Sequence, residues 1–331
     1  MAGEPLRLVF FGTPDFAVPS LEALLRSRHA VVGVVTQPDR PRGRGQHVTD
    51  SPVKQAAAAA GVPVLQPDRL KDEAFLAALH ALHADAGVVA AYGKILPAAV
   101  LASPRLGLIN VHASLLPRHR GAAPVHRAVL AGDAETGVSI MRVVQALDAG
   151  GVFATGTRPI GPDDTSAEVE HDLARLGASL LLEVLDQLAS GSAVETPQDD
   201  GAATYAHRLR KEEGLIDWRA GAAAIHNQVR GLQPWPMAWT FIGGQRLIII
   251  RTRIAPETAD SGRVPGSILQ VSRDAFRVQT GAGLLDVLTV QPEGRRAMAA
   301  RDFAAGHLGG DDVRFDLPPG APSPGTPAGG A

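Results

Sequence analysis

Cysteine is absent from this 331-residue sequence, and aromatic residues make up only 4% of it. A chain without cysteine forms no disulfide, offers a metal no thiolate ligand and has no cysteine nucleophile. The sequence also has no apolar run of about 18 residues, the length that a membrane-spanning helix requires. Residues 1–5 lack the basic and apolar pattern of a secretory signal. These absences predict a cytoplasmic protein.

The charges are nearly balanced, with 32 Lys and Arg against 34 Asp and Glu and a formal net charge of -2. No global basic field therefore attracts nucleic acid, and a site for a polyanion must be a local patch. The glycine turn at residues 12–15 lacks the three-glycine dinucleotide fingerprint, and no P-loop motif occurs, so neither NAD nor ATP is implied. His80 and His83 lack partners at metal-ligand spacing, and we expect no metal site.

Strand-like and helix-like segments alternate through the first 189 residues, which we predict to form one domain. Apolar runs end at turn residues, and amphipathic segments follow them, some with a clear start signal such as Ser51-Pro52. This order predicts an α/β domain with one mostly parallel sheet. The expected strands are residues 6–11, 30–36, 62–65, 86–91, 138–144 and 152–157, with a further strand in the stretch 108–117, where the chain turns away at Pro117. The expected helices include 52–60, 72–83, 98–101, 123–131 and 165–189.

The composition changes after residue 189, and the length of the chain already favours more than one domain. Residues 190–210 are polar and rich in Gly, Ser, Asp and Thr, which indicates a linker. Residues 211–315 contain one helix and then short strands separated by glycine turns, a pattern typical of a small β-barrel. Residues 316–331 are rich in Pro and Gly and are predicted to be disordered.

Three polar residues are the candidates for catalysis. Asn110 and His112 lie two residues apart at the end of an apolar segment, so on a strand both side chains point to the same face. Either residue alone is more typical of packing, and Asp148 in its Gly-rich turn is more typical of a turn former. Because strand carboxyl ends share one crevice in an open α/β sheet, we expect the three to meet there.

The three side chains together suit one kind of chemistry. An amide and an imidazole can donate hydrogen bonds to an oxyanion, while a neighbouring carboxylate keeps the imidazole charged and oriented. The set contains no serine or cysteine nucleophile with a base. The pattern therefore favours acyl transfer by direct attack of an amine, without a covalent intermediate.

Two groups of arginines are candidates for binding phosphate groups. Arg40, Arg42 and Arg44 alternate with Pro and Gly in the segment 37–50, which has few apolar residues and is predicted to be an exposed loop. Most charged loops are simply solvated, but these guanidinium groups could lie along a phosphate backbone. Arg295 and Arg296, with Arg301 nearby in sequence, form a second group in the predicted barrel. Two basic groups on a net acidic protein would suit a large folded RNA.

The sequence resembles the 10-formyltetrahydrofolate-dependent formyltransferase family, and within it the methionyl-tRNA formyltransferases, from about residue 6 to the end of the predicted β region. The resemblance is carried by motifs spread along the chain. They are Phe11-Gly12-Thr13-Pro14-Asp15-Phe16, Thr36-Gln37-Pro38-Asp39-Arg40-Pro41, Gly43-Arg44-Gly45, Ser51-Pro52-Val53-Lys54, Ala91-Tyr92-Gly93, Asn110-Val111-His112, Ser114-Leu115-Leu116-Pro117, Arg120-Gly121-Ala122-Ala123-Pro124, Gly132-Asp133-Ala134-Glu135-Thr136-Gly137, Leu147-Asp148-Ala149-Gly150 and Pro234-Trp235-Pro236.

The resemblance implies a Rossmann-like catalytic domain, a linker and a C-terminal barrel of the oligonucleotide-binding type. It implies that Asn110, His112 and Asp148 are catalytic and that 10-formyltetrahydrofolate is the formyl donor. It also implies methionyl initiator tRNA as the acceptor, with Arg44 in the inserted loop at the acceptor end, and we expect a monomer. The residues that it implies along the folate are Ser114, Leu115, Leu116, Pro117, Tyr92 and Gly93.

Two other functions remain open from the sequence. One is a folate-dependent formyltransferase that acts on a small amine, such as an amino sugar or a nucleotide. Such an enzyme would have little use for the arginine loop or for the barrel. The other is a non-catalytic RNA-binding protein, which would bind tRNA in a salt-dependent way without forming a product.

Overall fold

The computed structural model describes residues 3–39, 41–42, 47–256, 262–307 and 313–316. It divides into two compact units that interlace in sequence. The first consists of Met1–Val125, Glu135–Pro159 and Glu168–Arg208, and the second of His126–Ala134, Ile160–Ala167 and Leu209–Ala331. The second unit thus takes two segments from the part of the sequence that alternates between strands and helices. The boundaries that we predict at residues 189 and 210 stay a prediction.

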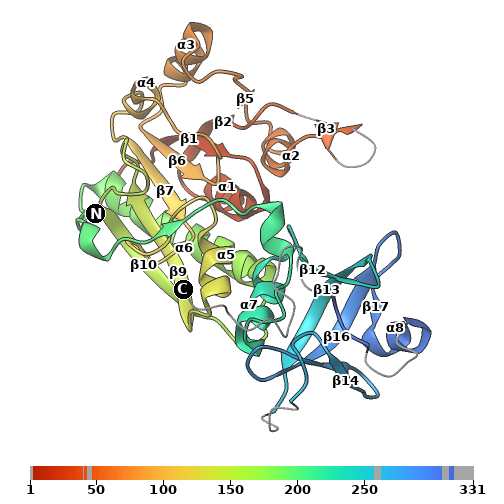
Figure 1. The fold of residues 1–331 in the computed structure, drawn as a ribbon. Coiled ribbons are helices and arrows are strands. Elements are labelled where there is room, and N and C mark those ends of the chain that lie inside the picture. The colour runs from red at the N-terminus through yellow and green to blue at the C-terminus, as the bar shows by residue number, and fades with distance from the viewer. Residues whose placement is uncertain (1–2, 40, 43–46, 257–261, 308–312, 317–331) are drawn as a thin grey trace, which may run out of the picture. The chain divides into compact units, whose positions relative to one another are not determined.

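Within the described residues, seven strands form the sheet of the first unit in the order β10-β9-β7-β6-β1-β2-β5 (Figure 1). The strands from β7 through β5 are parallel, whereas β9 is antiparallel to β7 and β10 is antiparallel to β9. The prediction of a mostly parallel sheet is confirmed, but its antiparallel edge was not predicted. The strands are β1 (Arg7–Gly12), β2 (Ala30–Val35), β5 (Val64–Leu65), β6 (Ala86–Ala90), β7 (Leu108–His112), β9 (Glu135–Arg142) and β10 (Val152–Pro159).

The central strands are apolar on both faces, as strands covered by helices on each side must be. Val9, Phe11 and Val35 are buried in a cluster with residues from the following helices. The start of α2 follows the predicted signal, because the Ser51 hydroxyl accepts a hydrogen bond from Lys54 N at 3.2 Å. The helices that begin in this half of the chain are α1 (Val18–Arg26), α2 (Pro52–Ala59), α3 (Glu73–Ala81), α4 (Ala98–Leu101), α5 (Pro124–Ala131) and α6 (Ser166–Ser190).

Two segments that we predicted to be irregular contain short paired strands. In the arginine segment 37–50, β3 (Pro41–Arg42) pairs with β4 (His47–Val48), so the prediction of a loop throughout was wrong. A loop that pairs with itself satisfies backbone groups that a polar sequence pattern does not reveal. In residues 190–210, β11 (Tyr205–Ala206) runs parallel to β8 (Arg120–Gly121). This segment therefore belongs to the structure of the first unit.

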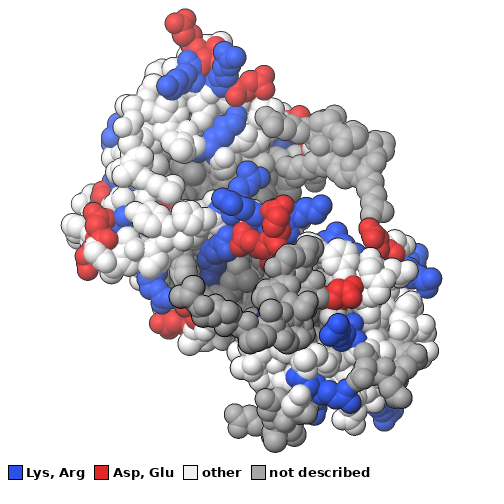
Figure 2. All heavy atoms as spheres, viewed as in Figure 1, with Lys and Arg blue, Asp and Glu red and all other residues white. Residues whose placement is uncertain are grey.

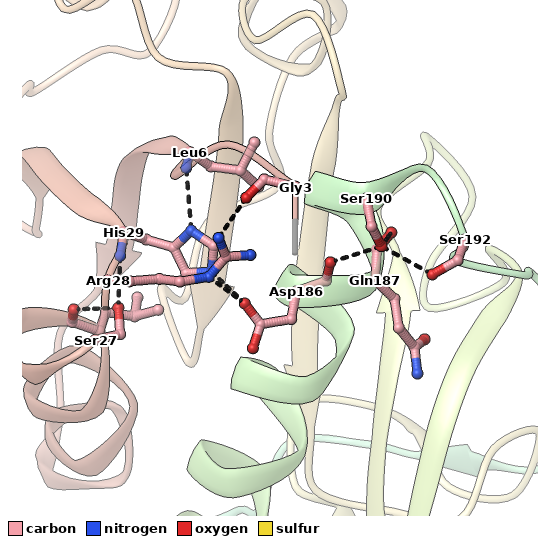
Figure 3. Close-up of polar contacts among 10 residues, drawn as sticks. Gly3, Leu6, Ser27, Arg28, His29, Asp186, Gln187, Ser190 and Ser192 are labelled. Atoms are coloured by element: carbon pink, nitrogen blue, oxygen red, sulfur yellow. Dashed lines mark hydrogen bonds and ion pairs between the residues drawn. The ribbon is translucent and has the colours of Figure 1, made fainter. Parts of the chain in front are cut away.

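The beginning of the chain is attached to the end of α6 (Figure 3). His29 accepts a hydrogen bond at Nδ1 from Leu6 N, 3.0 Å away, just before β1 begins. Its Nε2 lies 3.3 Å from Asp186 Oδ1, and Arg28 Nε donates to the same oxygen at 2.7 Å. Arg28 also donates to the carbonyl of Gly3. These contacts tie three separate parts of the first unit together.

The second unit has an antiparallel sheet in the order β12-β13-β16-β15-β14, with β17 paired to β16. Gly243 and Gly244 both have positive φ, 56° and 77°, in the turn between β12 and β13, which confirms the predicted hairpin. The elements of this unit are α7 (Ala222–Gly231), β12 (Ala238–Ile242), β13 (Gln245–Ile254), β14 (Ile268–Val271), β15 (Phe276–Gln279), β16 (Leu284–Pro292), β17 (Met298–Ala299), α8 (Ala300–His307) and a short 3-10 helix at Lys211–Gly214. Short 3-10 helices at Asp15–Ala17 and Asp200–Ala202 belong to the first unit.

The core of the second unit forms around Trp218, which is fully buried. Its ring stacks on that of Phe315 at 4.7 Å, and Phe276 lies 6.0 Å from Phe315. An α/β unit and a separate small β unit are the fold class that we predicted. Most of the predicted disordered segment, residues 317–331, lies outside the described residues. In the part of the chain described, no helix has the length and apolar character to cross a membrane.

Candidate active site

Asn110 is the third and His112 the last of the five residues of β7, an edge strand of the parallel part of the sheet. Their neighbour Val111 points to the other face, where a Cβ added to Gly177 of α6 would lie 2.6 Å from it. Because side chains alternate along a strand, Asn110 and His112 lie on the face opposite α6. Asn110 and His112 therefore share one face of the strand, as predicted, and α6 packs against the other face.

The His112 imidazole is 5% exposed and has an acceptor on each side. Its Nε2 lies 3.1 Å from the carbonyl oxygen of His119, which can only accept, so Nε2 carries the hydrogen of this bond. Its Nδ1 lies 3.7 Å from Asp148 Oδ2. This distance is longer than a hydrogen bond and close enough for a charge interaction.

Asp148 reaches His112 by a route that the sequence did not predict. We expected both residues at the carboxyl ends of parallel strands, but β9 is antiparallel to β7, so Arg142 at the end of β9 lies beside Ile109 near the start of β7. The segment 143–150 must therefore fold back toward the other end of the strand. Of the three candidate residues, His112 and Asp148 are in contact, as we expected. The reason that we gave, a shared carboxyl edge of parallel strands, was wrong.

The carboxylate of Asp148 is held by a backbone donor. Gly121 N donates to Asp148 Oδ2 at 2.8 Å. Both Asp148, with φ of 47°, and His119, with φ of 59°, adopt left-handed backbone conformations that are uncommon outside glycine. Such conformations persist where the surrounding structure enforces them, and they cluster at functional sites.

The predicted folate segment 114–117 forms a tight turn. The Ser114 hydroxyl is fully buried and donates to the carbonyl of Arg118 at 2.6 Å, so it stabilises the turn. The hydroxyl of Ser139 donates to Ser114 O at 2.7 Å and accepts from Leu116 N at 3.1 Å. Leu115, Leu116 and Pro117 remain partly exposed. Contact with a ligand from this segment would therefore come from these three residues.

Tyr92 is a core residue rather than a surface residue. Its ring packs edge-on against Phe11 at 5.6 Å, and its carbonyl accepts from Gln37 Nε2 at 3.0 Å. The phenol oxygen has no hydrogen-bond partner among the described residues, and burial raises the pKa of Tyr92 to about 12. The following Gly93 has φ of 81°, and a Cβ there would meet nothing within 4 Å, so the chain turns sharply into open space.

A pocket of about 840 Å³ opens beside this turn. Its lining is mostly apolar, with two lysines, and Ile95 in it is 84% exposed. The lining residues are Leu70, Lys71, Leu76, Lys94, Ile95, Leu96, Pro97, Ala98, Ala99 and Gln145. Gln145 lies in the same segment as Asp148, so one loop contributes to the pocket and to the His112 site. These residues were not predicted from the sequence, although the apolar pair Ile95-Leu96 shortly after Tyr92-Gly93 was a signal in it.

The structure describes the predicted basic residues only in part. Arg40 and Arg44 lie outside the described residues, and Arg42 ends the short strand β3. Arg295 and Arg296 are exposed in the turn after β16. On the face drawn in Figure 2, Lys and Arg are interspersed with Asp and Glu, which agrees with the balanced composition.

Lys54 fixes the base of the arginine segment from both sides. Its ammonium group forms ion pairs with Asp39 before the segment's strands and with Asp50 after them, the second at 2.7 Å. The hydrogen bond from Lys54 lowers the pKa of Asp39, and the same contact raises the pKa of Lys54. Gln66 also donates to Asp39, at 2.9 Å. Both ends of the segment are thus anchored to the start of α2.

The arrangement can bind and polarise a carbonyl group, and it offers a site for proton transfer. Asn110 supplies an amide, His112 an imidazole N–H, and Asp148 a carboxylate on the imidazole's other side. No three His, Asp or Glu side chains among the described residues lie together as metal ligands. An amide, an imidazole N–H and a carboxylate are groups that suit acid–base chemistry at a carbonyl carbon.

A Rossmann-like sheet combined with a separate antiparallel β unit is the architecture of formyltransferases. Two family models match this chain: Formyl transferase over residues 6–185, and Formyl transferase, C-terminal domain, over residues 208–308. The chain belongs to the formyl transferase family, and it is an enzyme of one-carbon group transfer.

Two relatives resemble it over nearly their whole length. The methionyl-tRNA formyltransferase of Moorella thermoacetica is 48% identical over 302 residues, which cover 91% of this chain and 96% of the relative. That of Methylobacillus flagellatus is 48% identical over 303 residues, which cover 91% and 97%. Among solved structures, the N-formyltransferase from Helicobacter canadensis, in complex with folinic acid and dTDP-3-aminofucose, has a TM-score of 0.64 at 17% identity. The match covers 86% of this chain and 99% of that chain. At this identity, the likeness shows a shared fold and no more.

Proposed function

We propose that this protein transfers the formyl group of 10-formyltetrahydrofolate to the α-amino group of methionyl initiator tRNA. The observation that carries the proposal is the contact of His112 with Asp148 at the end of β7, in a chain whose relatives are named methionyl-tRNA formyltransferases. The two basic groups support an RNA substrate. The finer assignments below are part of the proposal.

The acceptor amine needs little activation. A free α-amino group has a pKa of about 8, so a useful fraction is neutral at physiological pH. The amine nitrogen attacks the formyl carbon, and its lone pair forms the new C–N bond while the carbonyl π electrons move to oxygen. The enzyme must position the amine and stabilise this oxyanion.

Asn110 and His112 would stabilise the oxyanion. Asn110 donates from its amide, and the oxyanion competes with the His119 carbonyl for the hydrogen on His112 Nε2. The Asp148 carboxylate beside Nδ1 keeps the imidazole oriented and compensates its positive charge. The intermediate then collapses: the bond from carbon to N10 breaks, N10 takes up a proton, and the ammonium proton leaves through water or Asp148. The products are N-formylmethionyl-tRNA and tetrahydrofolate.

The pocket of about 840 Å³ would hold the folate. Its apolar lining suits a flat heterocycle, and Lys71 and Lys94 offer cations for the glutamyl carboxylates. Its volume lies in the usual range for pockets that bind molecules of this size. The turn at residues 114–117 would contact the part of the folate nearest His112.

The decisive test is an assay with purified protein, charged initiator tRNA and 10-formyltetrahydrofolate. We expect N-formylmethionyl-tRNA to form with both substrates present and not when the donor is omitted. Free methionine in place of the charged tRNA serves as the control for tRNA recognition. Formylation of a small amine without formylation of methionyl-tRNA would contradict the proposal, and so would tRNA binding without any product.

A further inference from the structure

The loop that carries Asp148 leaves the sheet and returns to it at nearly the same place. Arg142 N donates to Gly151 O at 2.8 Å, so residues 143–150 form an excursion closed at its base. The fit at the base is tight, because a Cβ on Gly150 would lie 1.9 Å from the carbonyl oxygen of Arg142. Val144, Gln145, Ala146 and Leu147 are all exposed. The far part of the loop therefore has little packing to define where Asp148 lies.

One side chain from a distant part of the sequence holds this loop. Gln198 Nε2 donates to the carbonyl oxygens of Asp148 and Gly150, at 2.8 Å and 2.7 Å. Both hydrogens of the amide are therefore donated to backbone carbonyls, one on each side of Ala149. Gln198 lies in the segment that the sequence analysis interpreted as a linker.

Arg120 determines which way the Gln198 amide faces. Its Nε and Nη2 both donate to Gln198 Oε1, at 3.0 Å and 2.8 Å. A guanidinium group has no acceptor, so the amide oxygen must face Arg120 and the NH₂ must face the loop. The Arg120 side chain is 4% exposed, and its Nη2 also pairs with Asp200 at 2.7 Å. Because two donors of this buried guanidinium bind the amide oxygen, the Gln198 amide has only one orientation.

The same short strand holds the Asp148 carboxylate. Gly121, next to Arg120 in β8, donates its N–H to Asp148 Oδ2. Ala122 N in turn donates to Ala206 O at 2.9 Å, and Arg120 N donates to Thr204 O at 2.8 Å. The backbone and the side chain of Asp148 are thus both anchored to the Arg120-Gly121 segment.

We propose that Arg120 and Gln198 are positioning residues that hold Asp148 against His112. Asp148 has a left-handed backbone and an exposed loop before it, so without these bonds it would relax away from the imidazole. A buried ionic group such as the Arg120 guanidinium is seldom the most stabilising choice for packing alone. It is well suited to holding a functional loop in one geometry. The inference rests on the role proposed above for Asp148.

The experiment compares the wild-type protein with Gln198→Met and Gln198→Glu. Methionine has a similar length and no polar atoms that donate, whereas glutamate still accepts from Arg120 but cannot donate to the two carbonyls. We expect both variants to lower kcat for formylation by about 10-fold to 100-fold, the range produced by a small misplacement of a reacting group. The KM value for the charged tRNA should stay within about twofold, because Gln198 is not among the residues proposed to bind the tRNA.

Gln228→Met is the matched control. Gln228 is also half-buried and also donates from Nε2 to two backbone carbonyls, those of Glu213 and Leu215, at 2.7 Å and 3.1 Å. It lies in the second unit. Its loss should lower the thermal midpoint to a similar extent and leave kcat within about twofold. A general effect of losing two hydrogen bonds would lower kcat equally in both variants, and that result would overturn the proposal.

A double variant links Gln198 to Asp148. If Gln198 acts through Asp148, then Gln198→Met should slow Asp148→Asn no further, because the effects of coupled residues do not add. A full additional loss in the double variant would mean that Gln198 acts independently, and would overturn the proposal. If Asp148→Asn keeps the wild-type kcat, the proposed role of Asp148 is wrong. If it loses activity while Gln198→Met and Gln198→Glu do not, only the positioning role is wrong.

Hydrogen exchange gives a readout that does not depend on the activity. In Gln198→Met the amide of Gly121, which donates to Asp148, and the segment 143–151 should exchange faster than in the wild type. Gln228→Met should leave both unchanged. Unchanged exchange at Gly121 in Gln198→Met would contradict the proposed anchoring even if no formylation were found.

Discussion

At the scale of single residues, the proposed chemistry of this protein depends on a few polar side chains at and near the end of an apolar strand. His112 is almost fully buried, yet both of its ring nitrogens face acceptors, the His119 carbonyl and the Asp148 carboxylate. A buried histidine in a packing role needs its hydrogen bonds satisfied, but it does not need a carboxylate held by Gly121 N next to it. The arrangement supports the proposed role of the pair in compensating charge that develops during the reaction.

Replacing either member of this pair should remove most of the activity. His112→Gln keeps a hydrogen-bond donor but cannot carry the positive charge, and Asp148→Asn keeps the shape but not the negative charge. We expect each to lower kcat by about 100-fold or more, the usual effect of losing one group that stabilises an oxyanion. Steady-state kinetics with charged tRNA measure this, with the thermal midpoint as a control for folding. A kcat within about threefold of wild type would refute the assignment.

At the scale of elements, the second unit is completed by a short segment at the end of the described chain. Phe315 stacks on Trp218, its N–H donates to Gly266 O at 2.9 Å, and Ile268 N donates to Val313 O at 2.9 Å. Asp316 N donates to Phe241 O, and Asp316 accepts from Gly244 N at 3.0 Å. The segment 313–316 therefore closes the core of this unit and touches the hairpin between β12 and β13.

Phe315→Ala should destabilise the second unit strongly. Removing a buried phenylalanine typically costs about 3–5 kcal/mol, because the apolar contact is lost and a cavity remains. Phe315→Leu fills most of the cavity and should cost clearly less. Urea unfolding followed by tryptophan fluorescence would measure both, because all three tryptophans, Trp218, Trp235 and Trp239, lie in the second unit. Equal stability of wild type and Phe315→Ala would show that the stacking does not support the core.

A second element-scale prediction concerns the start of β1. Burial, and after it the charge of Arg28, lower the pKa of His29, while Asp186 acts in the opposite direction. His29 is therefore neutral in the folded chain at pH values where the unfolded chain, with the ordinary value of 6.5, already binds a proton. Stability should fall as the pH drops from about 6.5 toward the folded pKa, and level off below it.

His29→Asn separates this titration from the hydrogen bond, since an amide oxygen can still accept from Leu6 N and does not titrate. We expect the free energy of unfolding of this variant to depend less on pH between about 7 and 5 than that of wild type. Urea unfolding at several pH values measures the difference. Identical pH profiles of the wild type and of His29→Asn would show that His29 does not contribute.

At the scale of the whole molecule, a protein with a net charge of -2 must bind a polyanion through local patches. Arg295 and Arg296 form one such patch, because both are exposed in the turn that follows β16. Arg295 and Arg296 belong to the second unit, whereas the groups proposed for the chemistry belong to the first. Their contribution should therefore appear in the binding of tRNA and not in the chemical step.

Replacing Arg295 and Arg296 together by Gln should raise KM for charged tRNA while KM for the folate stays the same. Each phosphate contact that is lost also reduces the dependence of binding on salt, by about 0.7 to 0.9 in the slope of log K against log salt. Titrations at several salt concentrations measure this. An unchanged salt slope would mean that the tRNA does not reach this turn.

Much of this architecture follows from local patterns in the sequence. Apolar runs such as residues 6–11 and 30–36 identified the parallel strands, Ser51-Pro52 identified the start of α2, and Gly243-Gly244 identified a hairpin. These features depend on neighbouring residues, and the physical chemistry of a strand, a helix start or a turn acts over only a few positions. The candidate residues Asn110 and His112 were found in the same way, from their spacing on one strand.

The tertiary structure alone decided how distant parts meet. Three features depend on partners more than 25 positions away in sequence. They are the direction of β9, the fold-back of residues 143–150, and the hydrogen bonds by which Arg120 and Gln198 fix that loop. The pocket beside Gly93 likewise takes residues from three separate segments. The sequence by itself determined which chemical groups are available and the fold class that carries them. Their placement depended on long-range hydrogen bonds and packing, because these join residues whose proximity no local pattern encodes.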